Sequence, residues 1–142
     1  MFTQDRAQIR GIFFRAWRNY RNGLPLEGIE KIILDIALRH PEYHALLENP
    51  DRYQDSDYPP EIGATNPFLH MGMHIAIEEQ LSIDQPVGIR SHYQRILKKT
   101  TDEHAAQHMV MECLAEMIWQ AQRNHGAPDE AGYFSCLEII GS

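Results

Sequence analysis

Apolar residues recur every three or four positions along most of the chain, which is the spacing that places them on one side of an α-helix. The pattern predicts helices at residues 4–21, 26–39, 66–82, 86–99, 101–124 and 128–140. Pro, Gly, Asn or Asp separates most of these ranges, as expected where helices begin and end. Because no alternating strand pattern appears, the sequence predicts an all-α fold.

The segment from Asn49 to Thr65 differs from the rest of the chain, because it is rich in Pro, Asp and Gly and keeps no helical period. It predicts a long loop between the second and third major helices. The chain has 142 residues, the usual size of one domain. We therefore expect a single helical domain over residues 1–142, built as a bundle of five or six helices.

Two of the predicted helices have clear start signals. Thr65 or Asn66 can cap the third major helix, and Pro67 then stands in its first turn. Thr100 followed three residues later by Glu103 is the pattern of a capping box. This pattern predicts that the fifth helix begins directly after Thr100.

Two of the predicted helices carry the same polar pattern, with His, His and Glu at steps of four residues inside apolar runs. The positions are His70, His74 and Glu78 in one helix and His104, His108 and Glu112 in the other. Each step advances about 40° around a helix and about 6 Å along it, so each trio projects from one side. We expect His108 and Glu112 to face inward, where the two trios can meet across the bundle.

Histidine and glutamate in this arrangement suit a metal ion. Imidazole nitrogen and carboxylate oxygen bind Zn, Fe, Mn, Ni or Cu, and facing helices of bundles are known places for such sites. Eight histidines placed at random would give about 0.4 pairs at this spacing, whereas the sequence has three, including His40 and His44. The HExxH zinc-protease motif and a repeated Glu-x-x-His motif are both missing. The sequence thus predicts a divalent transition-metal site with hydrolytic or redox chemistry and no stated substrate.

A metal-free core network explains the same pattern equally well. In this alternative, Glu78 and Glu112 accept hydrogen bonds from histidines of the opposite helix, because buried polar groups need partners. The protein would then be a non-catalytic interaction module. Residues 1–23 hold five arginines and one acidic residue, so Arg10 and Arg18 are candidates for binding an acidic protein, and a homodimer is the other arrangement. A solvated helix side also accounts for these arginines.

Charge, hydropathy and cysteine spacing limit the partners and the location. A net charge of −7 argues against a general nucleic-acid binder. No apolar run approaches the ~20 residues that span a bilayer, and the first residues lack a secretory segment, so we expect a cytoplasmic protein. Cys113 and Cys136 are far apart and lie in apolar helical patterns. We expect them to be reduced and buried rather than joined in a disulfide.

The strings NPFLHMGMHIAIEEQ, DQPVGI, AEMIWQAQR and PDEAGYF resemble a family of small bacterial proteins catalogued as a domain of unknown function. The resemblance covers most of the chain and rests above all on the residues from Asn66 to His74. It implies a cytoplasmic, helical bacterial protein of this length. It names no ligand, so the predicted metal site depends on residue spacing.

Overall fold

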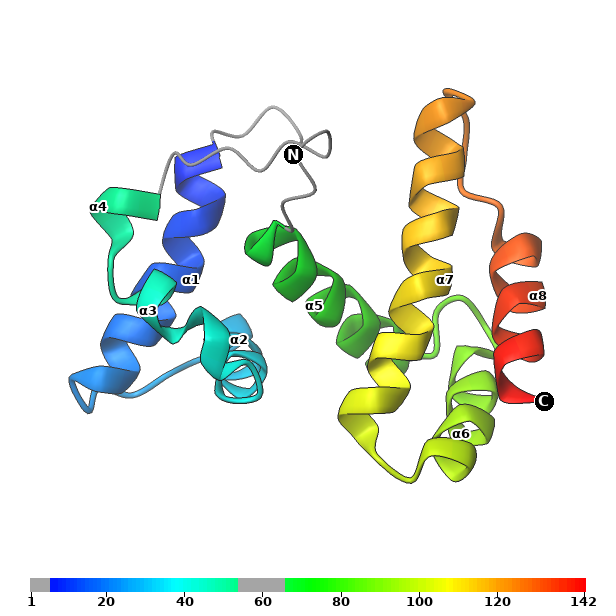
Figure 1. The fold of residues 1–142 in the computed structure, drawn as a ribbon, viewed down its shortest axis with the longest axis horizontal. Coiled ribbons are helices and arrows are strands. Elements are labelled where there is room, and N and C mark those ends of the chain that lie inside the picture. The colour runs from blue at the N-terminus through cyan, green and yellow to red at the C-terminus, as the bar shows by residue number, and fades with distance from the viewer. Residues whose placement is uncertain (1–5, 54–65) are drawn as a thin grey trace. The chain divides into compact units, whose positions relative to one another are not determined.

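The computed structural model describes residues 6–53 and 66–142 of the chain. Helices dominate both ranges and neither contains a strand, so the all-α prediction is confirmed (Figure 1). The chain divides into two compact units, Met1–Gly72 and Met73–Ser142. The single domain expected over the whole chain stays a prediction.

The first unit is built mainly from two helices that pack against each other, followed by short helical segments. Its elements are α1 (Arg6–Arg21), α2 (Ile29–Leu38), the 3₁₀ helix η1 (Pro41–Tyr43), α3 (His44–Leu47) and α4 (Pro50–Tyr53). Thus α4 occupies the start of the segment expected to be a loop, and residues 54–65 of that segment lie outside the described residues. The core of the unit includes Phe13, Phe14, Ala16, Trp17, Ile33, Ile36, Ala37, Leu46, Leu47 and Phe68.

Helix α5 (Pro67–Ile83) begins in the first unit and ends in the second. The side-chain Oδ1 of Asn66 accepts hydrogen bonds from the backbone N–H groups of Phe68 and Leu69, at 3.0 and 3.2 Å. Asn66 is therefore the cap that satisfies the first donors of the helix, as the sequence predicted. The cap sets where α5 begins and hence where its histidines stand along it.

The second unit consists of the later part of α5 and three further helices that pack pairwise. These are α6 (Ile89–Thr100), α7 (Glu103–Arg123) and α8 (Glu130–Gly141) (Figure 1). Its core includes Ile77, Ile89, Tyr93, Ile96, Ala106, Val110, Met111, Cys113, Leu114, Tyr133 and Leu137. The hydroxyl of Tyr133 on α8 donates to Oε1 of Gln80 on α5 at 2.8 Å. Burial raises the pKa of Tyr133, so this hydroxyl remains a neutral donor that joins the two helices.

The capping box expected at Thr100 is wrong. Thr100 is the last residue of α6, and its hydroxyl donates to the carbonyl oxygen of Ile96 at 3.1 Å. The chain turns at Thr101, which has a φ of 59°, and Asp102 then caps α7 by accepting from the backbone N–H of Ala105. Helix α7 still begins close to the expected place, because Asp102 is an equally good cap two residues later.

The expectation of two reduced cysteines is also wrong. Cys113 on α7 and Cys136 on α8 form a disulfide, with their Cα atoms 5.7 Å apart. The two helices are joined by a short connection and lie side by side (Figure 1). Their packing therefore brings together two cysteines that are 23 residues apart in the sequence. Neither spacing nor local pattern reveals that the two side chains face each other.

Among the helices of residues 6–53 and 66–142, none is both long enough and apolar enough to cross a membrane.

Candidate metal centre

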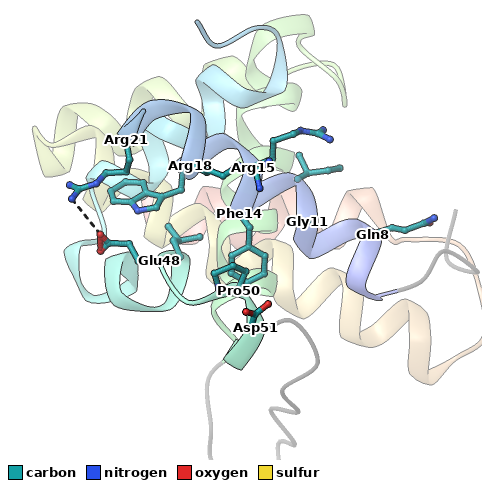
Figure 2. A pocket seen from close by; sticks show the side chains of 12 residues that line it. Gln8, Gly11, Phe14, Arg15, Arg18, Arg21, Glu48, Pro50 and Asp51 are labelled. Carbon is teal, nitrogen blue, oxygen red and sulfur yellow. Dashed lines mark ion pairs between the residues drawn. The ribbon is translucent and has the colours of Figure 1, made fainter. Parts of the chain in front are cut away.

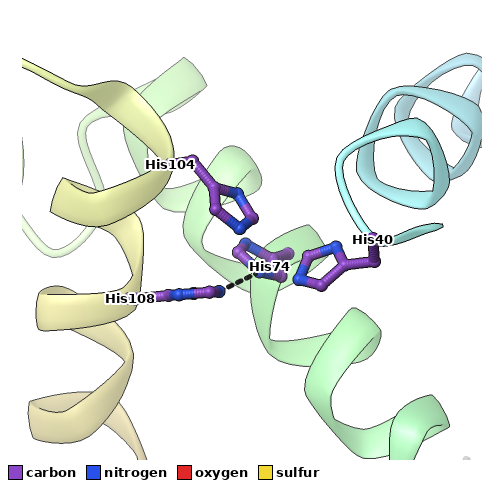
Figure 3. Close-up of side chains that lie close together, drawn as sticks. All are labelled: His40, His74, His104 and His108. Atoms are coloured by element: carbon purple, nitrogen blue, oxygen red, sulfur yellow. Dashed lines mark hydrogen bonds between the residues drawn. The ribbon is translucent and has the colours of Figure 1, made fainter. Parts of the chain in front are cut away.

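Three of the predicted histidines form a cluster within the second unit. His74 projects from α5, and His104 and His108 project from α7 one turn apart (Figure 3). Each ring offers a nitrogen within 4.8 Å of those offered by the other two. The rings of His74 and His104 are stacked, with centroids 5.4 Å apart, and the His108 ring lies 5.0 Å from the first and 4.2 Å from the second. His40, also drawn in Figure 3, belongs to the first unit.

The protonation of His74 follows from its partner. Nδ1 of His74 lies 2.8 Å from Oε1 of Gln107, and an amide oxygen only accepts hydrogen bonds. Nδ1 therefore carries the proton, and in the neutral ring Nε2 holds the lone pair. Nε2 of His108 lies 3.2 Å from this nitrogen and donates to it. The nitrogen of His74 that points into the cluster is thus the one able to bind a cation.

Gln107 is itself held by a carboxylate. Its Nε2 donates to Oε1 of Glu78 at 2.5 Å, which requires its amide oxygen to face His74. Gln107 is buried, with 3% of its surface exposed, and it links α7 to α5. Two successive hydrogen bonds therefore connect Glu78 to Gln107 and Gln107 to His74. Such partners behind a ligand fix its ring orientation and increase its basicity in many metal sites.

The spacing of the ring nitrogens agrees with metal binding. Two imidazole nitrogens bound to Zn²⁺ at about 2.0–2.1 Å in a tetrahedral arrangement lie about 3.3 Å apart. The two Nε2 atoms of His74 and His108 are 3.2 Å apart. Neutral imidazoles also suit Zn, Fe, Ni and Cu by ligand type. One pair of ring nitrogens therefore has the spacing of two ligands on a divalent transition metal, and His104 offers a third nitrogen within 4.8 Å of both.

His70, the first histidine of the α5 trio, belongs to a different pair. Its Nε2 lies 3.1 Å from Nε2 of His40, and both residues are in the first unit. Nδ1 of His40 in turn donates to the carbonyl oxygen of Ile36 at 2.8 Å, near the end of α2. Nε2 of His44 lies 2.7 Å from the next carbonyl oxygen, that of Ala37. His40 and His44, the third histidine pair in the sequence, thus provide hydrogen-bond partners for carbonyl oxygens at the end of α2.

The two glutamates of the predicted set have different surroundings. Glu78 is partly buried and is linked to His74 through Gln107. Glu112 is exposed, so its expected inward orientation is wrong. The reason is geometric: from His104 to Glu112 the two four-residue steps rotate the side chain by about 80° around the helix. The drift carries Glu112 off the side that His104 and His108 share.

Gln107 is the residue of the site that sequence reasoning missed. It stands on α7 directly before His108 and three residues after His104. The signal available in the sequence was a further polar residue between the two histidines of the predicted inner face. That signal alone does not show which side chain Gln107 meets.

The two arginines proposed for partner binding also have different surroundings. Arg10 is 5% exposed, donates from Nη1 to the carbonyl oxygen of Tyr53 at 3.1 Å and lies 4.5 Å from the centre of the Phe68 ring. It stabilises the first unit from inside. Arg18 is exposed and makes no ion pair with another residue of the described ranges. Of the two, only Arg18 offers its charge at the surface.

Comparison with known families gives a match over nearly the whole chain. The model of the domain of unknown function DUF1841 matches residues 5–139, nearly the whole chain. The chain belongs to the DUF1841 family. No curated protein and no solved structure matches it. Membership of DUF1841 assigns no ligand or reaction, so the chemistry of the site rests on the histidines and on the partners that orient them.

Proposed function

We propose that this protein binds a divalent transition-metal ion through His74, His104 and His108. The proposal is supported by the ligand type of all three side chains and by the 3.2 Å spacing of one pair of their ring nitrogens. The sequence predicted six ligands on two helices, and the proposal retains three of them. Glu78 is assigned a positioning role through Gln107 instead of direct ligation.

The observation that carries this proposal is the pair of hydrogen bonds made by Gln107. Because Glu78 accepts from its amide nitrogen, its amide oxygen is left to accept from Nδ1 of His74. The ring is thereby held with the Nε2 lone pair toward the other histidines. This tautomer is the one that a metal ligand bound through Nε2 requires.

The proposed chemistry is hydrolytic or redox and depends on the metal. A metal held by three histidines keeps an open position and, when bound, can polarise a substrate or activate water, or exchange electrons if it is Fe or Cu. Within this chain, Glu78 and Gln107 hold the His74 ring and keep the proton on Nδ1. The exposed Glu112 lies on a different side of α7 and has no role in this proposal.

The decisive experiment measures metal content in tag-free protein by inductively coupled plasma mass spectrometry. Wild-type protein, a His74→Ala, His108→Ala variant and the single His104→Ala variant are compared. His125→Asn is the matched control, because His125 is exposed, lies outside the cluster and has a φ of 52°, which Asn tolerates. We expect near-stoichiometric Zn, Fe, Mn, Ni or Cu in wild type and control, and loss in the cluster variants.

Circular dichroism of each variant separates metal loss from unfolding. Folded cluster variants without metal support the site. Wild-type protein that is metal-free and also fails to take up these ions contradicts the proposal. The cluster would then be the metal-free hydrogen-bond network of the alternative, in which Gln107 stands between Glu78 and His74.

The second candidate function is a non-catalytic interaction module that binds an acidic protein or forms a homodimer. It is supported by the exposed charge of Arg18 and by Trp119 on α7, whose side chain is 50% exposed. Sedimentation of wild type and of Arg18→Glu and Trp119→Ala variants tests it. Self-association that either variant abolishes favours a homodimer, and metal content should not change.

We also propose that the protein works in the bacterial cytoplasm. The Cys113–Cys136 disulfide is the observation that bears against this location, because disulfides are rare in cytosolic proteins. Alkylating free thiols in intact cells before lysis tests the location. Two blocked thiols per chain support a reducing compartment, whereas a persistent disulfide in freshly trapped protein opposes it.

A further inference from the structure

The first unit contains a groove of about 920 Å³ that lies along α1 and is independent of the histidine cluster (Figure 2). One wall is the side of α1 from Gln8 to Arg21, which extends for roughly 20 Å at 1.5 Å per residue. The other wall is formed by residues from the end of α3 and the start of α4, including Leu47, Pro50 and Asp51. The volume lies within the range of small-molecule sites, about 300–1,000 Å³.

The groove offers one uncommitted positive charge. Three arginines border it, but Arg15 pairs with Glu30 at 3.4 Å and Arg21 pairs with Glu48 at 3.6 Å. Only Arg18, between them on α1, has no ion pair within the described ranges. A single available guanidinium suits a single negative charge on a ligand.

The acidic side chains at the opposite wall limit the negative charge that a ligand of this groove can carry. Glu48 and the exposed Asp51 both line the groove across from α1 (Figure 2). A ligand carrying several negative charges would meet repulsion from these carboxylates. The charges therefore favour a monoanion over a nucleic acid or a strongly acidic protein surface.

Trp17 supplies an independent sign of a ligand. It lines the groove with only 4% of its surface exposed, and its indole Nε1 has no hydrogen-bond partner among the described residues. Its ring packs against those of Tyr20 and His44, with centroids 5.4 and 4.5 Å away. Leaving a buried donor unsatisfied costs about 1–3 kcal/mol, and an indole N–H can only donate. An acceptor atom on a ligand would remove this cost.

The remaining surface of the groove is suited to an apolar body. Ile12, Phe14, Leu47 and Pro50 contribute to its lining between the charged positions. Sites for small ligands typically combine such a lining with a few polar groups that fix orientation. Among the polar groups that line this groove, the guanidinium of Arg18 has no ion pair within the described ranges, and Trp17 adds a buried indole N–H without a hydrogen-bond partner there.

We propose that this groove binds a monocarboxylate with an extended apolar body, such as a medium-chain fatty acid. The carboxylate pairs with Arg18 and accepts from the indole N–H of Trp17. The apolar chain lies along α1 against Phe14, Leu47 and Pro50. The proposal goes beyond metal binding and uses none of the cluster residues, so either can fail without the other.

The chain offers a direct optical test, because it has two tryptophans and only Trp17 lies in the groove. In a Trp119→Phe variant, Trp17 is the single tryptophan reporter. This variant is titrated with sodium decanoate below its micelle-forming concentration and, separately, with decanol, and isothermal calorimetry repeats both titrations. We expect a saturable change in Trp17 emission with decanoate and weaker binding of decanol.

Substitution of Arg18 distinguishes the charged contact from general apolar binding. In the same background, Arg18→Gln should weaken decanoate binding about tenfold, the equivalent of one charge-assisted hydrogen bond, and leave decanol unchanged. Arg123→Gln is the matched control, because Arg123 is an exposed arginine on α7, outside the groove. It should change neither affinity.

Three results would overturn the proposal. They are the absence of saturable decanoate binding, equal affinity for decanoate and decanol, and an Arg18→Gln variant that binds decanoate as the parent does. A glutamate-rich peptide serves as the competing ligand. If the peptide binds and decanoate does not, the surface recognises an acidic protein and the monocarboxylate site is rejected.

Discussion

The two units use the same histidine spacing for different purposes. In the first unit, the nitrogens of His40 and His44 contact the carbonyl oxygens of Ile36 and Ala37, so backbone at the end of α2 holds the rings. In the second unit, His74 is held by a side chain, Gln107, and faces two further histidines. A four-residue step places two rings on one side of a helix. The groups that the ring nitrogens contact decide whether the rings bind the carbonyl oxygens at a helix end or form a cluster that can bind metal.

The units also differ in how they are stabilised and in what they expose. The first has a core rich in aromatic rings, where Phe68 meets Phe13 and Phe14 edge to face at 5.9 and 5.6 Å. The second has a largely aliphatic core and a disulfide between α7 and α8. The first presents a charged groove, whereas the cluster of the second has one buried histidine, His74, and two that are partly buried, His104 and His108. Each contrast leads to a measurement that can sharpen or break the comparison.

The largest effect is expected from truncating a core side chain in each unit. Ile33 in the first unit and Ile96 in the second are 1% and 0% exposed, so substitution by Ala should cost about 2–5 kcal/mol of unfolding free energy in each case. Hydrogen exchange followed by mass spectrometry reports protection for each helix. We expect Ile33→Ala to lower protection in α1 and α2, and Ile96→Ala to lower it in α6, α7 and α8. Equal loss everywhere in both variants would show that the units unfold as one.

The disulfide should stabilise only the second unit. Closing a segment of 23 residues between Cys113 and Cys136 limits the unfolded chain and contributes about 3 kcal/mol in the loop-entropy model. A Cys113→Ser, Cys136→Ser variant should therefore lose protection in α7 and α8 and retain it in α1 and α2. Reductant should have the same effect on wild type and none on the variant. A reductant-sensitive first unit would contradict the contrast.

Removing Gln107 should weaken metal binding without removing a ligand. Gln107→Ala leaves Nδ1 of His74 without its acceptor, and losses of this kind typically lower metal affinity about 10- to 100-fold. Competition with a chromophoric chelator measures the affinity. His44→Ala is the comparison from the first unit, where it should lower stability and leave metal affinity unchanged. Equal affinities in Gln107→Ala and wild type would show that orientation of His74 does not matter.

The smallest effect is expected at the helix caps of the second unit. Asp102 accepts from the N–H of Ala105, and Asp129 accepts from the N–H of Gly132. Replacing either aspartate with Ala should cost about 1 kcal/mol, measured by chemical denaturation. Thr100→Ala should cost less, because Thr100 does not cap α7. A larger loss at Thr100 than at Asp102 would restore the capping box expected from the sequence.

The sequence by itself determined the helices and most of their limits. The apolar period of 3.6 residues depends only on neighbouring positions, and a cap such as Asn66 bonds to N–H groups two and three residues away. These are local interactions, so they can be read in order along the chain. The same locality explains why spacing alone indicates His74, His104 and His108 as three of six candidate ligands.

Only the tertiary structure decided which side chains meet. It placed Gln107 between Glu78 and His74, joined Cys113 to Cys136 and left Glu112 exposed. Each outcome depends on the rotation and register of one helix against another. The rotation and register are set by many side chains that pack simultaneously, which no single stretch of sequence reveals. A rotation of about 80° is enough to move a residue from the site to the surface.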